Sequence, residues 1–140
     1  MKASVLHKFC TPPIFMEVDD PVCGPNSVVI ELKACGVCRS DHHAWSGNDP
    51  DVKLPHIMGH ELAGIVVETG SEIKKFSTGD HVTVPFILGC GLCSDCQKGN
   101  STICEKQETI GFTIRGGFAQ FVEICFADFN LVRLPSSLGF

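Results

Sequence analysis

Apolar and polar positions alternate along much of the chain with the two-residue period of β-strands. Val28, Ile30 and Leu32 are separated by single residues, so a strand buried on one face is predicted over 27–35. The same alternation, or a short apolar run between turn residues, predicts further strands over 62–68, 82–86, 118–126 and 131–134.

Turn residues interrupt these strands often, and helix signals are scarce. The chain has 14 glycines and 8 prolines, which is typical of a barrel or sandwich of many short strands. Only 40–45 and 94–98 are predicted to form a turn or two of helix. No repeat or low-complexity stretch divides the 140 residues, which is one domain's usual length. We therefore predict a single, mainly β domain with few short helices.

Composition narrows the class of protein. The chain has 11 Lys+Arg against 16 Asp+Glu, with Lys74-Lys75 as its only basic pair, so no nucleic-acid partner is expected. No run of 18 apolar residues occurs, so no membrane partner is expected either. Charges interrupt the first residues too early for a signal peptide. We expect a cytoplasmic protein whose nine cysteines stay reduced.

The strongest chemical signal is a cysteine cluster with the spacing C-x2-C-x2-C-x7-C, formed by Cys90, Cys93, Cys96 and Cys104. Two-residue gaps let successive sulfurs face one point, as in tetrahedral zinc sites. Four thiolates leave no position for water, so the site would be structural. The alternatives are two disulfides or inert thiols, which fit a reducing compartment poorly, and an iron–sulfur cluster, whose usual spacings differ.

A second group of metal-capable side chains comes from two separate segments. Cys38 and His60 could bind one zinc ion and leave positions open for a third ligand and for water or substrate, as in catalytic sites. Asp41 or Glu61 could hydrogen-bond the ligand histidine. Two alternatives remain: an ordinary His-Glu pair, and a redox pair of Cys35 and Cys38, which needs a thioredoxin-like α/β unit where β structure is predicted.

Together these motifs resemble the zinc-dependent alcohol dehydrogenases of the medium-chain dehydrogenase/reductase family. The resemblance rests on Gly36-Val37-Cys38-Arg39-Ser40-Asp41-His42-His43, on Gly59-His60-Glu61-Leu62-Ala63-Gly64, on 70–84, and on the four-cysteine loop. It covers essentially the whole chain in the family's order. It implies that residues 1–140 form the family's GroES-like catalytic domain, a distorted β-barrel with few helices.

The resemblance also implies metal ligands. Cys38 and His60 would bind the catalytic zinc, Glu61 would lie beside the metal, and Asp41 would orient the ligand histidine. The structural zinc would take four thiolates, those of Cys90, Cys93, Cys96 and Cys104.

Further roles follow from the same resemblance. Ser40 would take the proton of a zinc-bound alcohol and His43 would pass it toward solvent, a chain suited to a hydroxyl and an imidazole. Arg39 would contact the cofactor pyrophosphate through its forked guanidinium. Trp45 and Phe86 would be walls of the substrate pocket, although ordinary core packing is an equal interpretation for Trp45.

Two parts of the family's enzymes have no counterpart in these residues: the third catalytic ligand, usually a cysteine, and a nucleotide-binding Rossmann domain with its G-x-G-x-x-G turn. We therefore expect a fragment of an NAD- or NADP-linked enzyme that interconverts alcohols with aldehydes or ketones and forms a homo-oligomer when intact. The fragment alone should hold structural zinc and lack activity. Its catalytic zinc should be weakly held, or completed by Glu61, water or a neighbouring chain.

Two other functions stay open. One is a polyol or formaldehyde dehydrogenase of the same superfamily. The other is a non-catalytic, zinc-stabilised β-barrel module that works by binding or assembly, for which the four-cysteine loop would be sufficient. Such a module has no reason to assemble Cys38, Ser40, His43, His60 and Glu61.

Overall fold

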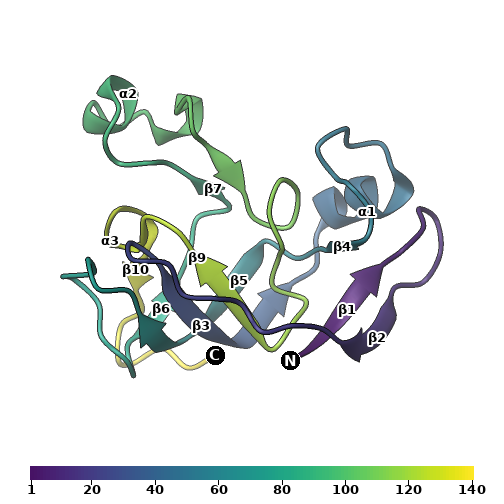
Figure 1. Cartoon of the computed structure of the whole chain (residues 1–140), viewed down its shortest axis with the longest axis horizontal. Coiled ribbons are helices and arrows are strands. Elements are labelled where there is room, and N and C mark those ends of the chain that lie inside the picture. Colours follow the sequence, from purple (N-terminus) through teal and green to yellow (C-terminus); the bar gives the residue numbers. More distant parts are fainter.

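Three antiparallel β-sheets make up most of the computed structural model, which describes all residues from 1 to 140 (Figure 1). The largest sheet has the order β10-β6-β5-β3-β9. Its strands are β3 (Val28–Gly36), β5 (Glu61–Thr69), β6 (His81–Thr83), β9 (Phe121–Ile124) and β10 (Val132–Arg133).

Two smaller sheets complete the β structure. The first has the order β2-β1-β4 and the second pairs β7 with β8. Their strands are β1 (Lys2–Leu6), β2 (Ile14–Glu17), β4 (His56–Ile57), β7 (Ile87–Leu88) and β8 (Glu108–Thr109). A bridge between Ala3 and Ala119 joins β1 to the segment before β9, so the first sheet continues the edge of the largest one. The fold is mainly β, as predicted, but β9 and β10 do not pair and the sheets do not close into one continuous barrel.

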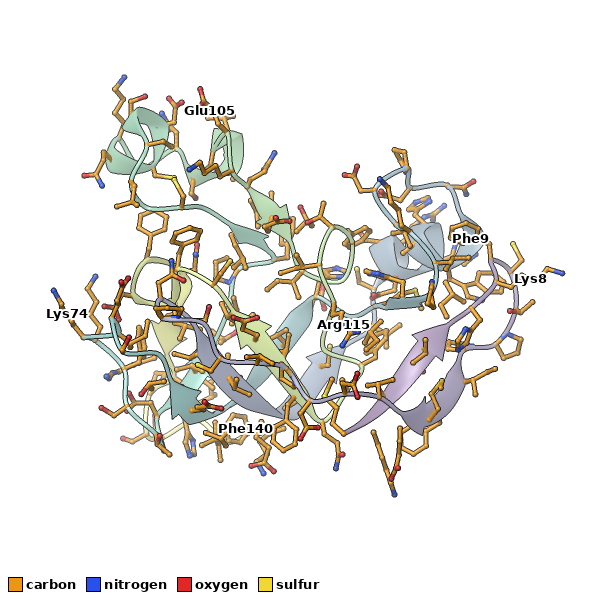
Figure 2. All side chains as sticks on the ribbon, in the orientation of Figure 1. Lys8, Phe9, Lys74, Glu105, Arg115 and Phe140 are labelled. Atoms are coloured by element: carbon orange, nitrogen blue, oxygen red, sulfur yellow. The ribbon has the colours of Figure 1, made fainter.

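The helices are short and lie outside the sheets. They are α1 (Arg39–Ser46), α2 (Ser94–Gln97), the 3-10 helix η1 (Ser101–Ile103) and α3 (Ala127–Asn130). None is both long enough and apolar enough to cross a membrane. Figure 1 shows the segment with α2 standing away from the sheets, and Figure 2 places Glu105 on this projection.

The core lies along the long antiparallel pairing of β3 with β5. Val28 and Ile30 from β3 are fully buried, and so is Val66 from β5. Gly64 permits the close approach of these strands, because a Cβ atom there would lie 2.1 Å from the carbonyl oxygen of Glu31. This central pair holds the two segments that carry Cys38 and His60, since β3 ends just before one and β5 begins just after the other.

The predicted strands at 27–35 and 62–68 are confirmed to within a residue at each end, and both predicted helices form. The strand predicted over 82–86 ends at Thr83, before Pro85, whose nitrogen has no hydrogen to donate to a sheet. The predictions at 118–126 and 131–134 are confirmed over shorter spans. The sequence pattern did not predict β1, β2, β4, β7 and β8.

Candidate metal centres

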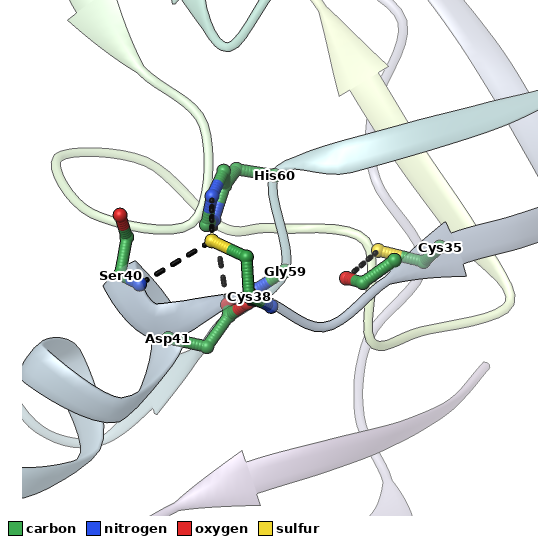
Figure 3. A network of polar contacts seen from close by, with 7 residues as sticks. Cys35, Cys38, Ser40, Asp41, Gly59 and His60 are labelled. Carbon is green, nitrogen blue, oxygen red and sulfur yellow. Dashed lines mark hydrogen bonds and ion pairs between the residues drawn. The ribbon is translucent and has the colours of Figure 1, made fainter.

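Cys38 and His60 lie side by side at the ends of β3 and β5, 22 residues apart in sequence (Figure 3). The Sγ atom of Cys38 is 3.2 Å from Nε2 of His60. A zinc ion held tetrahedrally by one thiolate and one imidazole would separate these atoms by about 3.5 Å. The two donors therefore fit one metal ion.

The α1 helix positions Cys38. Its sulfur accepts a hydrogen bond from the Ser40 N–H at 3.3 Å, and its own N–H donates to Oδ2 of Asp41 at 2.9 Å. This reciprocal arrangement is a capping box, with Cys38 as the residue before the helix. Gly47 ends the helix in the left-handed conformation, with φ at 76°. The local fold of 38–47 thus sets the direction of the candidate ligand.

Asp41 connects the two donors. Its buried carboxylate also accepts the Gly59 N–H at 3.2 Å through Oδ1, which lies 3.4 Å from Nδ1 of His60. That ring nitrogen is buried and has no hydrogen-bond partner. Histidines that bind metals commonly direct their second nitrogen at a carboxylate. The arrangement leaves Nε2 of His60 facing the sulfur, as a metal ligand requires.

A cavity of about 430 Å³ opens over this pair. Ser40 and His43 line it from α1, and both are solvent-exposed. Aromatic rings form another part of its wall, with centroids 6.1 Å (Phe86) and 5.2 Å (Phe112) from that of His60. The complete lining is Cys38, Ser40, His43, Asn48, Asp49, His60, Glu61, Phe86 and Phe112. The cavity therefore combines two metal donors, a hydroxyl and an imidazole.

The four predicted cysteine ligands also converge. Cys90, Cys93, Cys96 and Cys104 offer sulfur atoms that all lie within 4.8 Å of one another. The Sγ atoms of Cys93 and Cys104 are 3.9 Å apart, and four thiolates around zinc would lie about 3.8 Å from each other. All nine cysteines are free thiols, so the two-disulfide alternative has no support in this structure.

Backbone N–H groups prepare this cluster for a cation. Leu92 and Cys93 each donate to the Sγ atom of Cys90 at 3.4 Å, and these two bonds lower the pKa of that thiol to about 6. Burial has the opposite effect on Cys96 and raises the pKa of its thiol. A dication offsets the cost of burying several thiolates together, so the donor set fits zinc.

Cys35 does not join either group. Its sulfur lies apart from that of Cys38 in Figure 3, and its thiol donates to the Gly36 carbonyl oxygen at 3.7 Å. Burial raises the pKa of this thiol to about 11. Because the thiolate is the reactive form, the structure does not favour the alternative of a redox pair.

The remaining predicted site residues lie in different settings. Glu61 lines the cavity and is exposed, whereas Arg39 is exposed at the start of α1 and does not line the cavity. Trp45 lies outside the lining, packs beside a buried cluster that contains Ala44, and donates its indole N–H to Thr11 at 2.7 Å.

Three residues that line the cavity were not predicted from the sequence: Asn48, Asp49 and Phe112. The first two follow the end of α1, where the helix prediction could have indicated them. Phe112 comes from a loop distant in sequence, and nothing in its neighbourhood gives a periodic signal.

The fold and the two donor sets define a class: a mainly β metal-binding domain with one closed set of four thiolates and one open Cys-His pair in a cavity. Comparison with known families makes the class specific. The chain belongs to the alcohol dehydrogenase GroES-like domain family, whose family model matches residues 24–136.

Individual relatives agree with this membership. An alcohol dehydrogenase of Geobacillus stearothermophilus is 38% identical over 142 aligned positions, which cover 100% of the chain and 42% of the relative. A solved zinc-binding dehydrogenase from Sinorhizobium meliloti 1021, bound to NADP, has a TM-score of 0.84 and 32% identity over 99% of the chain and 39% of its own. A cobalt- and zinc-bound alcohol dehydrogenase from Pyrobaculum aerophilum has a TM-score of 0.82 and 33% identity. This match covers 95% of the chain and 41% of the relative. The chain thus spans less than half the length of each.

Proposed function

We propose that the chain is the catalytic domain of a zinc-dependent, NAD- or NADP-linked alcohol dehydrogenase that interconverts alcohols with aldehydes or ketones. The observation that carries the proposal is the 3.2 Å approach of Cys38 Sγ and His60 Nε2 in a cavity that Ser40 and His43 also line. A non-catalytic module stabilised by zinc would need only the four-cysteine cluster. The open donor pair therefore favours the enzyme.

The residues present would hold two metal ions. Cys38 and His60 would hold a catalytic zinc with Glu61 beside it, and the four cysteines of the loop would hold a structural zinc. When bound, the catalytic zinc supplies a Lewis acid that lowers the pKa of an alcohol hydroxyl, and the nicotinamide supplies a hydride acceptor. Asp41 Oδ1, which lies 3.4 Å from Nδ1 of His60, would fix the tautomer and direction of the His60 ring when the metal is bound.

Proton movement falls to Ser40 and His43. Ser40 Oγ would accept the alcohol proton while its own hydroxyl proton passes toward His43, and the imidazole of His43 would release a proton to water; both side chains are exposed. Phe86 would restrict the substrate beside His60. Trp45, which packs against the buried cluster that contains Phe112, would support the cavity wall indirectly. Arg39, at the exposed start of α1, would contact the cofactor pyrophosphate.

The remaining parts of the proposal concern the protein to which this domain belongs. A third ligand of the catalytic zinc and a nucleotide-binding domain would come from residues outside these 140. Free thiols throughout are consistent with a reducing compartment such as the cytoplasm. Leu92 and Ile103, which are 80% and 61% exposed on the four-cysteine loop, are suited to a contact between copies in a homo-oligomer.

Cobalt(II) substitution tests the function on the chain itself. With cobalt in excess, two ions should bind per chain, the second one weakly, and trifluoroethanol should shift the visible bands of that second ion. Cys38→Ser should bind one cobalt ion and lose the response to alcohol. Cys10→Ser, which removes an exposed thiol, should behave as the wild type.

The outcome separates the two candidate functions. A single cobalt ion in the wild type, with no response to trifluoroethanol, would favour the binding or assembly module. The chain alone is not expected to oxidise ethanol with NAD, because these residues contain no nucleotide-binding turn of the G-x-G-x-x-G type and the contact from Arg39 would not hold the cofactor by itself. Such turnover would contradict the proposal that hydride transfer requires a separate nucleotide-binding domain.

A further inference from the structure

The side chain of Asn130 links the four-cysteine loop to the body of the domain. It lies at the end of α3 and is only 4% exposed. Its Oδ1 accepts the Gly89 N–H at 3.0 Å, and its Nδ2 donates to the Gly89 carbonyl oxygen at 2.9 Å. Nδ2 also donates to the carbonyl oxygens of Phe126 and Cys125, at 3.1 and 3.3 Å. One amide thus binds both backbone groups of Gly89 and fixes them to the α3 segment.

Gly89 is the residue before Cys90, the first ligand of the loop. The Cys90 N–H in turn donates to the Sγ atom of Cys104 at 3.4 Å, so the position of Gly89 determines where the first and last ligands meet. The neighbour of Asn130 contributes to the same contact. A Cβ atom at Gly89 would lie 3.0 Å from the Phe129 ring, and one at Gly91 would lie 2.8 Å from it.

Leu88, just before Gly89, is buried in the main core cluster, and the amide of Asn130 is the side chain that holds the next residue. Figure 1 shows the segment with α2 projecting from the sheets, with α3 below it in that view. The two-residue strands β7 and β8 form its base. Because the segment projects, a contact at Gly89 has more influence on the sulfur positions than one in the core of the sheets.

We infer that Asn130 is a positioning residue of the four-cysteine metal site, and that it acts through Gly89 to place Cys90. The inference rests on the metal site of the proposed function and is independent of dehydrogenase activity. An amide is required, because one oxygen must accept an N–H while one nitrogen donates to carbonyl oxygens. A carboxylate at 130 has the same shape, but its second oxygen would face the carbonyl oxygens of Gly89, Phe126 and Cys125 without a proton to share.

The test measures metal affinity in a Cys38→Ser background, where the loop is the remaining site. The probe is cobalt(II), read by its thiolate charge-transfer band and by competition with a chelator. Asn130→Asp should weaken binding by about 10- to 100-fold, the range for residues that support metal ligands. Asn26→Asp is the matched control. Asn26 is half-buried, its side chain makes no hydrogen bond, and it lines a cavity together with Cys90 and Phe126. Its variant therefore adds the same charge beside the loop without removing an amide contact, and it should keep the parent affinity.

A second measurement separates positioning from general stability. If Asn130 acts on the metal site, Asn130→Asp should lower the unfolding free energy more in the cobalt-loaded chain than in the metal-free one. Equal losses in both forms, with unchanged affinity, would overturn the inference and leave the metal site intact. If the Cys38→Ser parent chain shows no thiolate band with cobalt, both the role of Asn130 and the four-cysteine metal site itself would be overturned. Should Asn130→Asp fail to fold, Asn130→Ser carries the same expectations.

Discussion

The imidazole ring of His60 lies 5.2 Å from the ring of Phe112, at an interplanar angle of 57°. Its Nδ1 faces Asp41 and its Nε2 faces Cys38. Neighbours from two separate parts of the chain, the start of α1 and Phe112, thus determine the direction of one candidate ligand. Metal binding at this site should depend on residues that never touch the metal.

Asp41→Asn should weaken metal binding at the Cys38-His60 site by about 10- to 100-fold. Both carboxylate oxygens of Asp41 face N–H groups, so the amide nitrogen of the variant would meet either the Cys38 N–H, or the Gly59 N–H and the Nδ1 side of His60, without a lone pair, and one of the two metal donors would shift. Cobalt(II) titration, read by the bands of the second ion, measures the change. Binding at the four-cysteine loop is the internal reference and should stay constant.

An exposed carboxylate provides the control for that experiment. Asp19→Asn removes the same charge at an exposed position that is distant in sequence from both groups of metal ligands. It should leave the metal affinities of both sites unchanged. Equal effects of the two variants would mean that Asp41 contributes only net charge. Because Asp41 also caps α1, the unfolding free energy of the metal-free chain should be recorded beside each titration.

Zinc should stabilise the domain through the four-cysteine loop. In Cys38→Ser, the unfolding free energy should rise by about 1.4 kcal/mol for each tenfold increase of free zinc above the dissociation constant, the slope for one ion bound by the folded state. Urea unfolding in zinc buffers measures this slope. Adding Cys93→Ser removes one of four ligands and should flatten it, and an undiminished slope would place the zinc elsewhere.

Acid should destabilise the chain partly through His56. Burial lowers the pKa of this imidazole below its ordinary value, and the nearby positive charge of Arg115 acts in the same direction. The unfolded chain therefore binds a proton more readily, so this contribution to stability is complete above about pH 6.5 and is lost as the pH falls toward the folded-state pKa. Urea unfolding should be measured at about pH 7.5 and about pH 5.5, which bracket the ordinary pKa of histidine. The free energy of unfolding should differ less between these two pH values in His56→Gln than in the wild type.

His7→Gln is the reference for the pH experiment, because His7 is exposed. This variant should keep the pH dependence of the wild type. A His56→Gln variant that loses as much stability on acidification as the wild type would contradict the assignment to His56.

Gly64→Ala should be strongly destabilising, although alanine normally fits strands as well as glycine. The new methyl group would lie 2.1 Å from the carbonyl oxygen of Glu31 and 2.7 Å from Ile30, so β5 would have to move away from β3. We expect a loss of about 3 kcal/mol, the upper end for overpacking, in urea unfolding. Gly139→Ala meets no atom within 4 Å and should leave stability unchanged.

Much of the fold could be predicted because its main strands carry a clear pattern. The alternation around Ile30 and the run that includes Val66 indicated the central pair, whose buried face the structure confirms. The strand β2 could not be found in this way, since Ile14, Phe15 and Met16 are apolar in succession and give no two-residue alternation, and all four of its residues are exposed. The two-residue strand β4 exists only because it pairs with β1.

The two groups of metal ligands also differ in how far the sequence alone predicts them. The spacing of Cys90, Cys93 and Cys96 is local, so their convergence follows from short turns. The pairing of Cys38 with His60 depends on the register of β3 against β5, and it was expected from the family resemblance together with the residue types. Phe112 and Asn130 act through contacts made only in the folded chain, and no spacing indicates them.

The chain between β7 and β8 carries all four sulfur ligands of the loop. Between these strands, Lys98 is exposed and separates three of the loop's sulfur ligands from the fourth, Cys104. A protease cut after Lys98 would leave two polypeptides, with thiolates of both on the same metal ion. The zinc would then be a cross-link that a chelator can open and added metal can restore, in a position where other domains use a disulfide.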